Sequence, residues 1–221
     1  MLYTRALRER PELHERVRQL SRRMFVDYPI AQDILGEVEC LTLFEQDERE
    51  GRLIVAKSGN GKTYIAKRIL RRFPPRNDPS ASAAEIPVVR VLMPGKASRR
   101  EFAQQVLRAL GQTRKPSTST DALLASVFAL IPALGVKTLL LDDFQHLNAG
   151  ADSEKLALRN EIKKLGEECN VTMIALGIHT ALNVINLDDQ MLGRFEPMPM
   201  PLWGVNDDLR SLVHHLEDCA T

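Results

Sequence analysis

The sequence predicts an α/β fold, a five-stranded parallel sheet with flanking helices. Short segments that are apolar throughout alternate with amphipathic helical segments, which is typical of a parallel sheet covered on both faces. A glycine-rich loop joins the first strand to a helix, and two adjacent acids end a later strand. Both features fall at carboxyl ends of strands, where sheets of this kind bind their ligands.

The composition fits a folded chain with a sizeable core. Of the 221 residues, 44% are hydrophobic and 27% are charged, which excludes an intrinsically disordered chain. Lys and Arg number 30 against 29 Asp and Glu, so only a local basic patch could bind nucleic acid. The three cysteines (Cys40, Cys169 and Cys219) show no metal-binding spacing, and no apolar run is long enough to span a bilayer. We therefore expect a cytoplasmic protein with no membrane partner.

The N-terminal half is expected to begin with helices and then to alternate strands and helices. Residues 1–45 form the expected N-terminal helical segment, because apolar residues recur there at helical spacing among charged ones. Stretches rich in Pro, Ser and Thr separate the later elements. The expected elements are a helix over 30–44, a strand over 52–56, a helix over 61–73, a strand over 87–93, a helix over 98–110 and a helix that begins with an Asp cap at Asp121.

The C-terminal half is expected to supply three more strands. Residues 136–143 (VKTLLLDD) are a continuous apolar run ending in two acids, as in a strand buried on both faces. A charged amphipathic helix over 153–168 follows, then an apolar strand over 171–177 and a short fifth strand over 197–203. The sequence contains no internal repeat.

The loop AKSGNGKT over residues 56–63 is the strongest functional signal. It follows a strand, opens a helix and matches the phosphate-binding pattern G-x-x-x-x-G-K-[ST], except that Ala56 replaces the first glycine. The glycines let backbone N–H groups wrap a phosphate, Lys62 reaches the β- and γ-phosphates, and the Thr63 hydroxyl can ligate Mg²⁺. We therefore predict a site for ATP and Mg²⁺, with nucleotide contacts from Ser58, Gly59, Asn60, Gly61, Lys62, Thr63 and Tyr64.

The two acids that end the run TLLLDD have distinct predicted roles. Asp142 would hold Mg²⁺ together with Thr63, directly or through water. Asp143 would orient and deprotonate the attacking water. Many such ATPases carry Glu at the second position, and Asp is one methylene shorter, so we expect slow ATP hydrolysis. The two motifs, with a strand and helices between them, suit the additional-strand class of P-loop ATPases.

Beyond these motifs, the chain from about residue 25 to residue 205 resembles the TniB family, transposition ATPases of the AAA+ class that are related to TnsC and more distantly to MuB and IstB. The stretches that carry the resemblance are SGNGKT, PVVRVLMPGKASRREFAQQVLRALG, LLLDDFQHL with RNEIKKLGEE after it, and ALGIHTALNVINLDDQMLGRFEPMPMPLW. The resemblance implies an AAA+ ATPase core over 46–205, followed over 206–221 by the start of a C-terminal helix or a truncated lid.

The resemblance implies an ATP-dependent regulator of DNA transposition. Such a protein forms a ring or a helical filament on double-stranded DNA, marks the target, and recruits or activates a transposase. Its expected partners are double-stranded DNA contacted through the backbone, further copies of itself, a transposase and, in RNA-guided transposons, a target-selection complex. This function places the protein in the cytoplasm of a prokaryote, at the nucleoid.

The resemblance also implies roles for residues outside the two motifs. Arg194, just before the fifth strand, is expected to reach the γ-phosphate in a neighbouring subunit's site. His179 or Thr180 would sense the γ-phosphate, because Ile178 stands where the family tends to carry a polar residue. Candidates for contacts to DNA phosphates are Lys96, Arg99 and Arg100, with Arg114 and Lys115 as secondary ones. A solvated helix start is the alternative explanation for this basic cluster.

Three other functions share parts of this pattern. The first is an AAA+ helicase loader or remodelling ATPase, which carries the same motifs but binds a different partner. The second is a scaffold that binds ATP and scarcely hydrolyses it, because Asp143 replaces the usual Glu and Ile178 replaces the polar sensor residue. A small-molecule P-loop kinase would need an acceptor pocket and an arginine-rich lid, and the sequence indicates neither.

Overall fold

The computed structural model describes residues 29–44, 51–76, 84–186 and 189–202. The chain divides into two compact units, of which one, residues 33–202, contains the sheet. The other unit, residues 1–32 and 203–221, lies almost entirely outside the described residues. The C-terminal segment expected over 206–221, and most of the N-terminal segment expected over 1–45, therefore fall outside them as well.

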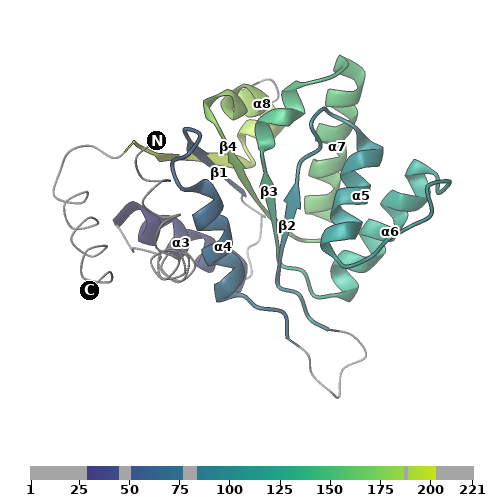
Figure 1. Ribbon diagram of the computed structural model, residues 1–221, viewed down its shortest axis with the longest axis horizontal. Helices are drawn as coiled ribbons and strands as arrows, with labels where there is room; N and C mark the ends of the chain where they lie inside the picture. Colours follow the sequence, from purple (N-terminus) through teal and green to yellow (C-terminus); the bar gives the residue numbers. More distant parts are fainter. Residues whose placement is uncertain (1–28, 45–50, 77–83, 187–188, 203–221) are drawn as a thin grey trace, which may run out of the picture. The chain divides into compact units, whose positions relative to one another are not determined.

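The five strands form one parallel sheet in the order β2-β3-β4-β1-β5, which confirms the predicted fold class (Figure 1). The strands are β1 (Gly51–Ala56), β2 (Val88–Leu92), β3 (Thr138–Asp142), β4 (Thr172–Gly177) and β5 (Phe195–Met200). β4 pairs with both β1 and β3. One strand thus lies between the strand of the glycine-rich loop and the strand of the two acids, as the additional-strand class requires.

Helices cover both faces of the sheet. Figure 1 shows α3 and α4 on one face and α5, α6 and α7 on the other. The connection from β1 to β2 runs along the sheet in one direction and the later ones run in the opposite direction, so right-handed crossovers place α4 opposite α5, α6 and α7. The helices are α3 (Pro29–Leu43), α4 (Lys62–Arg72), α5 (Arg99–Ala109), α6 (Thr120–Ala133), α7 (Asp152–Glu168), α8 (Leu182–Asn186) and α9 (Asp189–Leu192), with the 3₁₀ turns η1 (Phe144–Asn148) and η2 (His179–Ala181).

The central strands form the core because helices cover them on both sides. Every residue of β3 and of β4 is buried. Phe144 and Phe195 are fully buried, and their ring centroids lie 5.2 Å apart. Since Phe144 directly follows the two acids, its packing fixes the chain at the point where it leaves β3.

The start of α6 differs from the expectation. Ser119 is the N-cap, and its hydroxyl accepts a hydrogen bond from the backbone N–H of Ala122 at 3.2 Å. The expected cap at Asp121 is therefore wrong, because Ser caps a helix as well as Asp does and stands two residues earlier. Asp121 lies in the first turn, where its negative charge favours the helix dipole.

β5 lies earlier in the chain than expected. It spans Phe195–Met200 instead of 197–203, because the buried Phe195 anchors its start and the N–H of Gly51 donates to the carbonyl of Arg194 at 2.7 Å. Its two prolines are tolerated at the edge of the sheet, where ladder hydrogen bonds are needed on one side. None of the helices in the described ranges is long and apolar enough to cross a membrane.

Candidate nucleotide site

Two glycines shape the loop that follows β1. Gly59 and Gly61 have φ angles of 79° and 90°, a left-handed conformation that other residues rarely adopt. Gly61 is also the N-cap of α4, and no side chain caps this helix end. The first N–H groups of α4 therefore remain available to a phosphate, and the positive end of the helix dipole adds to the attraction.

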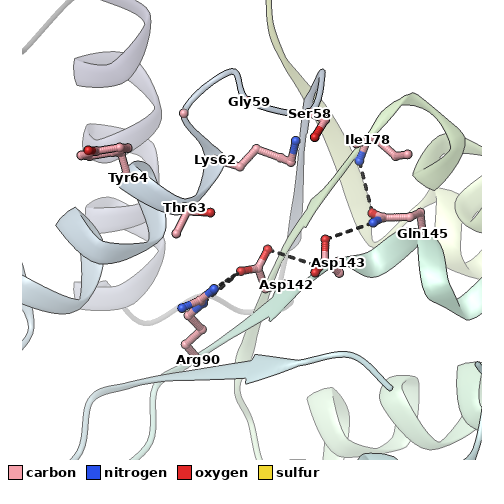
Figure 2. Close-up of a pocket in the computed structure, with 11 residues that line it drawn as sticks. Ser58, Gly59, Lys62, Thr63, Tyr64, Arg90, Asp142, Asp143, Gln145 and Ile178 are labelled. Carbon is pink, nitrogen blue, oxygen red and sulfur yellow. Dashed lines mark hydrogen bonds and ion pairs between the residues drawn. The ribbon is translucent and has the colours of Figure 1, made fainter. Parts of the chain in front are cut away.

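Lys62, the first residue of α4, reaches back across the loop. Its Nζ donates hydrogen bonds to the carbonyl oxygens of Ala56 at 2.8 Å and Lys57 at 2.9 Å. Burial lowers the pKa of Lys62, while the negative charges of Asp143 and Asp142 act in the opposite direction. Figure 2 shows the ammonium group in the space between the loop and the two acids, where a phosphate wrapped by the loop would meet it.

Asn60 attaches the loop to the far strand of the sheet. The residue is buried, and its side-chain amide nitrogen donates to the carbonyls of Met200 at 3.1 Å and Pro201 at 3.0 Å. The backbone N–H of Asn60 donates to Lys57. Although Asn60 was predicted to contact nucleotide, its side chain here positions the loop against the end of β5.

The two acids at the end of β3 have very different surroundings. Asp142 is 5% exposed, and its Oδ1 accepts a hydrogen bond from the backbone N–H of Asp143 at 3.0 Å. Asp143 has φ 59° and ψ 42°, a left-handed conformation that costs a residue with a Cβ about 1–3 kcal/mol. Asp143 is half-buried, whereas Asp142 is buried, and both line the same pocket.

Two residues that were not predicted from the sequence, Arg90 and Gln145, complete a hydrogen-bonded chain from the middle of β2 past the end of β3 to the end of β4 (Figure 2). Arg90 on β2 forms an ion pair with Oδ2 of Asp142, with its Nε at 3.0 Å. Gln145 donates from Nε2 to Oδ1 of Asp143 at 3.1 Å and accepts at Oε1 from the N–H of Ile178 at 3.3 Å. A signal for Arg90 was present, since it is the one charged residue in the apolar run PVVRVLM. Gln145 carried no such signal.

These groups surround one pocket of about 450 Å³. Its lining residues are Ser58, Gly59, Gly61, Lys62, Thr63, Tyr64, Arg90, Asp142, Asp143, Gln145 and Ile178. The Thr63 hydroxyl and the Asp142 carboxylate are hard oxygen donors of the kind that Mg²⁺ prefers. Within the described ranges no group of three or more His, Cys, Asp or Glu side chains could hold a metal. The donors present fit Mg²⁺ as nucleotide enzymes bind it, through one or two side chains plus phosphate oxygens.

The other predicted catalytic residues lie outside this lining. Ile178 reaches the pocket, whereas His179 and Thr180 form the exposed turn η2 beside it. The guanidinium of Arg194 donates to the carbonyl of Lys163 at 3.2 Å and forms an ion pair with Glu167, both near the C-terminal end of α7. Arg194 therefore lies outside the nucleotide pocket of its own chain.

The predicted DNA-binding residues separate into two groups. Arg99 forms an ion pair with the buried Glu161 at 2.9 Å, and Arg100 donates to the carbonyl of Thr118 at 2.6 Å. Lys96 and Lys115 are exposed. Arg114 is exposed too, with contacts at 3.5 Å to its neighbours Gln112 and Thr113. The two arginines at the start of α5 thus stabilise the fold, and the two lysines extend toward solvent.

A family model and several solved structures resemble the chain. The model described as "Bacterial TniB protein" matches residues 16–205. No curated protein matches. The Orc1 protein of Aeropyrum pernix, solved in complex with DNA, has a TM-score of 0.60 at 16% identity over 86% of this chain and 48% of its own. Cdc6p of Pyrobaculum aerophilum has a TM-score of 0.55 at 17% identity over 90% of this chain and 52% of its own.

A Walker-type ATPase of Pyrococcus abyssi has a TM-score of 0.55 at 12% identity over 88% of this chain and 59% of its own. At these identities the likeness shows the shared fold alone. The chain spans about half the length of the Orc1 and Cdc6 structures that it matches.

Proposed function

The chain belongs to the TniB family, and on that premise we propose that it is an ATPase that assembles on double-stranded DNA when ATP is bound, marks the DNA as a transposition target and recruits a transposase. A ring or a helical filament would be the assembled form. Such a protein works at the nucleoid of a prokaryotic cell.

The observation that carries this proposal is the convergence of groups from separate strand ends on one pocket. The loop after β1 supplies N–H groups and Lys62 for phosphates, and the end of β3 supplies Asp142 and Asp143. Thr63 and Asp142 would hold Mg²⁺, which when bound neutralises phosphate charge and orients the γ-phosphate. Lys62 would bind the β- and γ-phosphates with charge-assisted hydrogen bonds.

Asp143 is the candidate general base, and its surroundings favour slow hydrolysis. Its Oδ1 accepts a hydrogen bond from Gln145, so one carboxylate oxygen is already engaged, and its side chain is one methylene shorter than that of Glu. Gln145 also accepts a hydrogen bond from the N–H of Ile178, so one side chain positions both Asp143 and the residue that follows β4. A long-lived ATP state suits a protein whose product is an assembled polymer.

Arg194 is proposed to complete the site of a neighbouring subunit. It stands between α9 and β5, its guanidinium contacts the end of α7 away from its own pocket, and its ion pair with Glu167 is exposed enough to exchange for a phosphate. A guanidinium supplied by a neighbour would stabilise charge on the γ-phosphate and link the nucleotide state to assembly. For DNA, the exposed Lys96 and Lys115 would contact backbone phosphates without reading sequence.

Negative-stain electron microscopy of the chain with double-stranded DNA tests this proposal, in four conditions: no nucleotide, ADP, ATP and a non-hydrolysable ATP analogue. We expect rings or filaments with the two triphosphates alone. The Arg194→Ala variant should bind nucleotide normally and fail to assemble, while Lys164→Ala, which removes an exposed charge from the helix that Arg194 contacts, should assemble like the wild type. Single particles in all four conditions would contradict the proposal.

A further inference from the structure

Arg90 places a second cation in the nucleotide pocket, beside the predicted metal ligand. It stands on β2 opposite Leu140 of β3, and it lines the pocket together with Lys62 and Thr63. Its guanidinium donates two hydrogen bonds to Oδ2 of Asp142, one from Nε and one from an Nη nitrogen. Figure 2 shows this contact directly beneath Thr63 and Lys62.

This contact leaves Asp142 with little capacity for a metal ion. The carboxylate is buried, its Oδ1 accepts the N–H of Asp143, and its Oδ2 accepts two donors from Arg90. A guanidinium that binds in this way is strongly held, and its charge cannot be removed by deprotonation. Three of its roughly four lone-pair sites are thus occupied, and a cation near Oδ2 would meet the positive charge of Arg90, so a metal ion that takes Asp142 as a ligand competes with Arg90.

We propose that Arg90 neutralises the charge of Asp142 when no metal ion is bound, so that the pocket can bind nucleotide without Mg²⁺. When a nucleotide with bound Mg²⁺ enters, the guanidinium of Arg90 moves away from Asp142. Without Arg90, the buried Asp142 would repel the phosphates unless a metal neutralised it. With Arg90, the carboxylate is already neutralised, so Lys62 and the loop can bind phosphates alone. This inference rests on the proposed nucleotide site and concerns its metal dependence.

The test is binding of a fluorescent ATP analogue, measured with excess Mg²⁺ and again with EDTA, for the wild type and for Arg90→Gln. Removal of metal should weaken binding by less than about threefold in the wild type and by more than about tenfold in Arg90→Gln. The matched control is Arg108→Gln, because Arg108 is exposed on α5 and contacts Gln105 of the same helix. Arg108→Gln should behave like the wild type.

A double variant keeps the proposal testable if Arg90→Gln folds poorly with its carboxylate unpaired. Arg90→Gln combined with Asp142→Asn removes both charges, so binding in EDTA should return to within about threefold of the wild-type value, and Mg²⁺ should no longer strengthen it. Circular-dichroism melting of each variant without nucleotide shows whether it is folded.

Three results would overturn the proposal. One is an equal loss on metal removal in the wild type and in Arg90→Gln. Another is equal weakening of Arg90→Gln with and without metal, which would make Arg90 an ordinary phosphate ligand. The third is a double variant that binds as poorly in EDTA as the single one. These measurements need no DNA, so a failure to assemble in the microscope would contradict the proposed function and leave this inference standing.

Discussion

Two regions of the molecule are rich in cationic side chains, and they use them in opposite ways. In the nucleotide pocket, Lys62 and Arg90 come from different elements and line the same space, with Lys62 held by carbonyls of the glycine-rich loop and Arg90 by Asp142. In the basic segment over 96–115, Arg99 and Arg100 turn back into the protein, toward Glu161 and backbone carbonyls. A charged residue can therefore bind a ligand only where the fold leaves its side chain facing that ligand.

Among substitutions in the pocket, Asp143→Asn should have the largest effect, and that effect should be on the rate of ATP hydrolysis. Loss of the general base should slow single-turnover ATP hydrolysis about 10²–10⁴-fold, with ATP affinity nearly unchanged. Asn adopts the left-handed conformation of position 143 readily, so the fold should persist. Asp143→Glu is the companion variant, and its longer side chain should raise the rate. Hydrolysis at the wild-type rate in Asp143→Asn would remove Asp143 from the catalytic role.

A smaller but clear effect is expected from Lys62→Ala on nucleotide binding. Loss of its charge-assisted hydrogen bonds to phosphate should weaken ATP binding about 10–100-fold in calorimetry. Lys67→Ala, one turn along α4 and beside the Tyr64 ring, is the control and should bind ATP normally. If the two variants bind ATP equally well, the pocket is not a phosphate site.

In the basic segment, Arg99→Ala should act on stability. It leaves Glu161 buried without its partner, which we expect to lower the free energy of unfolding by about 1–3 kcal/mol in urea denaturation. This loss is smaller than that for a fully buried ion pair because the side chain of Arg99 is partly exposed. Arg99→Ala together with Glu161→Ala should recover part of the loss. Unchanged stability in the single variant would return Arg99 to the candidate DNA surface.

The smallest effect is expected from Lys96→Ala, and it should appear in DNA binding alone. Lys96 is exposed at the loop after β2, which is held by the hydrogen bond from Ala97 N–H to the carbonyl of Ala149. Removal of one phosphate contact should reduce the slope of log affinity against log salt by about one, with no change in stability. Glu101→Ala is the control on the adjacent helix. An unaltered slope in Lys96→Ala would separate this loop from the DNA.

Local patterns predicted the pocket better than the surface for a physical reason. The loop SGNGKT and the acids of TLLLDD depend on backbone geometry at a strand end, and such geometry is encoded within a few residues. Arg90 and Gln145 reach the pocket through pairing of β2 with β3 and through the turn η1, which are tertiary arrangements. The side chain of Arg99 turns into the protein because it pairs with Glu161, which lies 62 positions away in the chain. Capping by Ser119 in place of Asp121 shows how small differences decide a boundary.

A nucleotide site shared between subunits can be tested by mixing two inactive variants and measuring ATP hydrolysis on double-stranded DNA. Lys62→Ala lacks a working pocket but keeps Arg194, whereas Arg194→Ala keeps its pocket but lacks the arginine for its neighbour. If a neighbour completes each site, each variant alone should be inactive, and an equal mixture should regain roughly a quarter of the wild-type rate, the share of interfaces that pair an intact pocket with an intact arginine. A mixture as inactive as its components would contradict a nucleotide site shared between subunits.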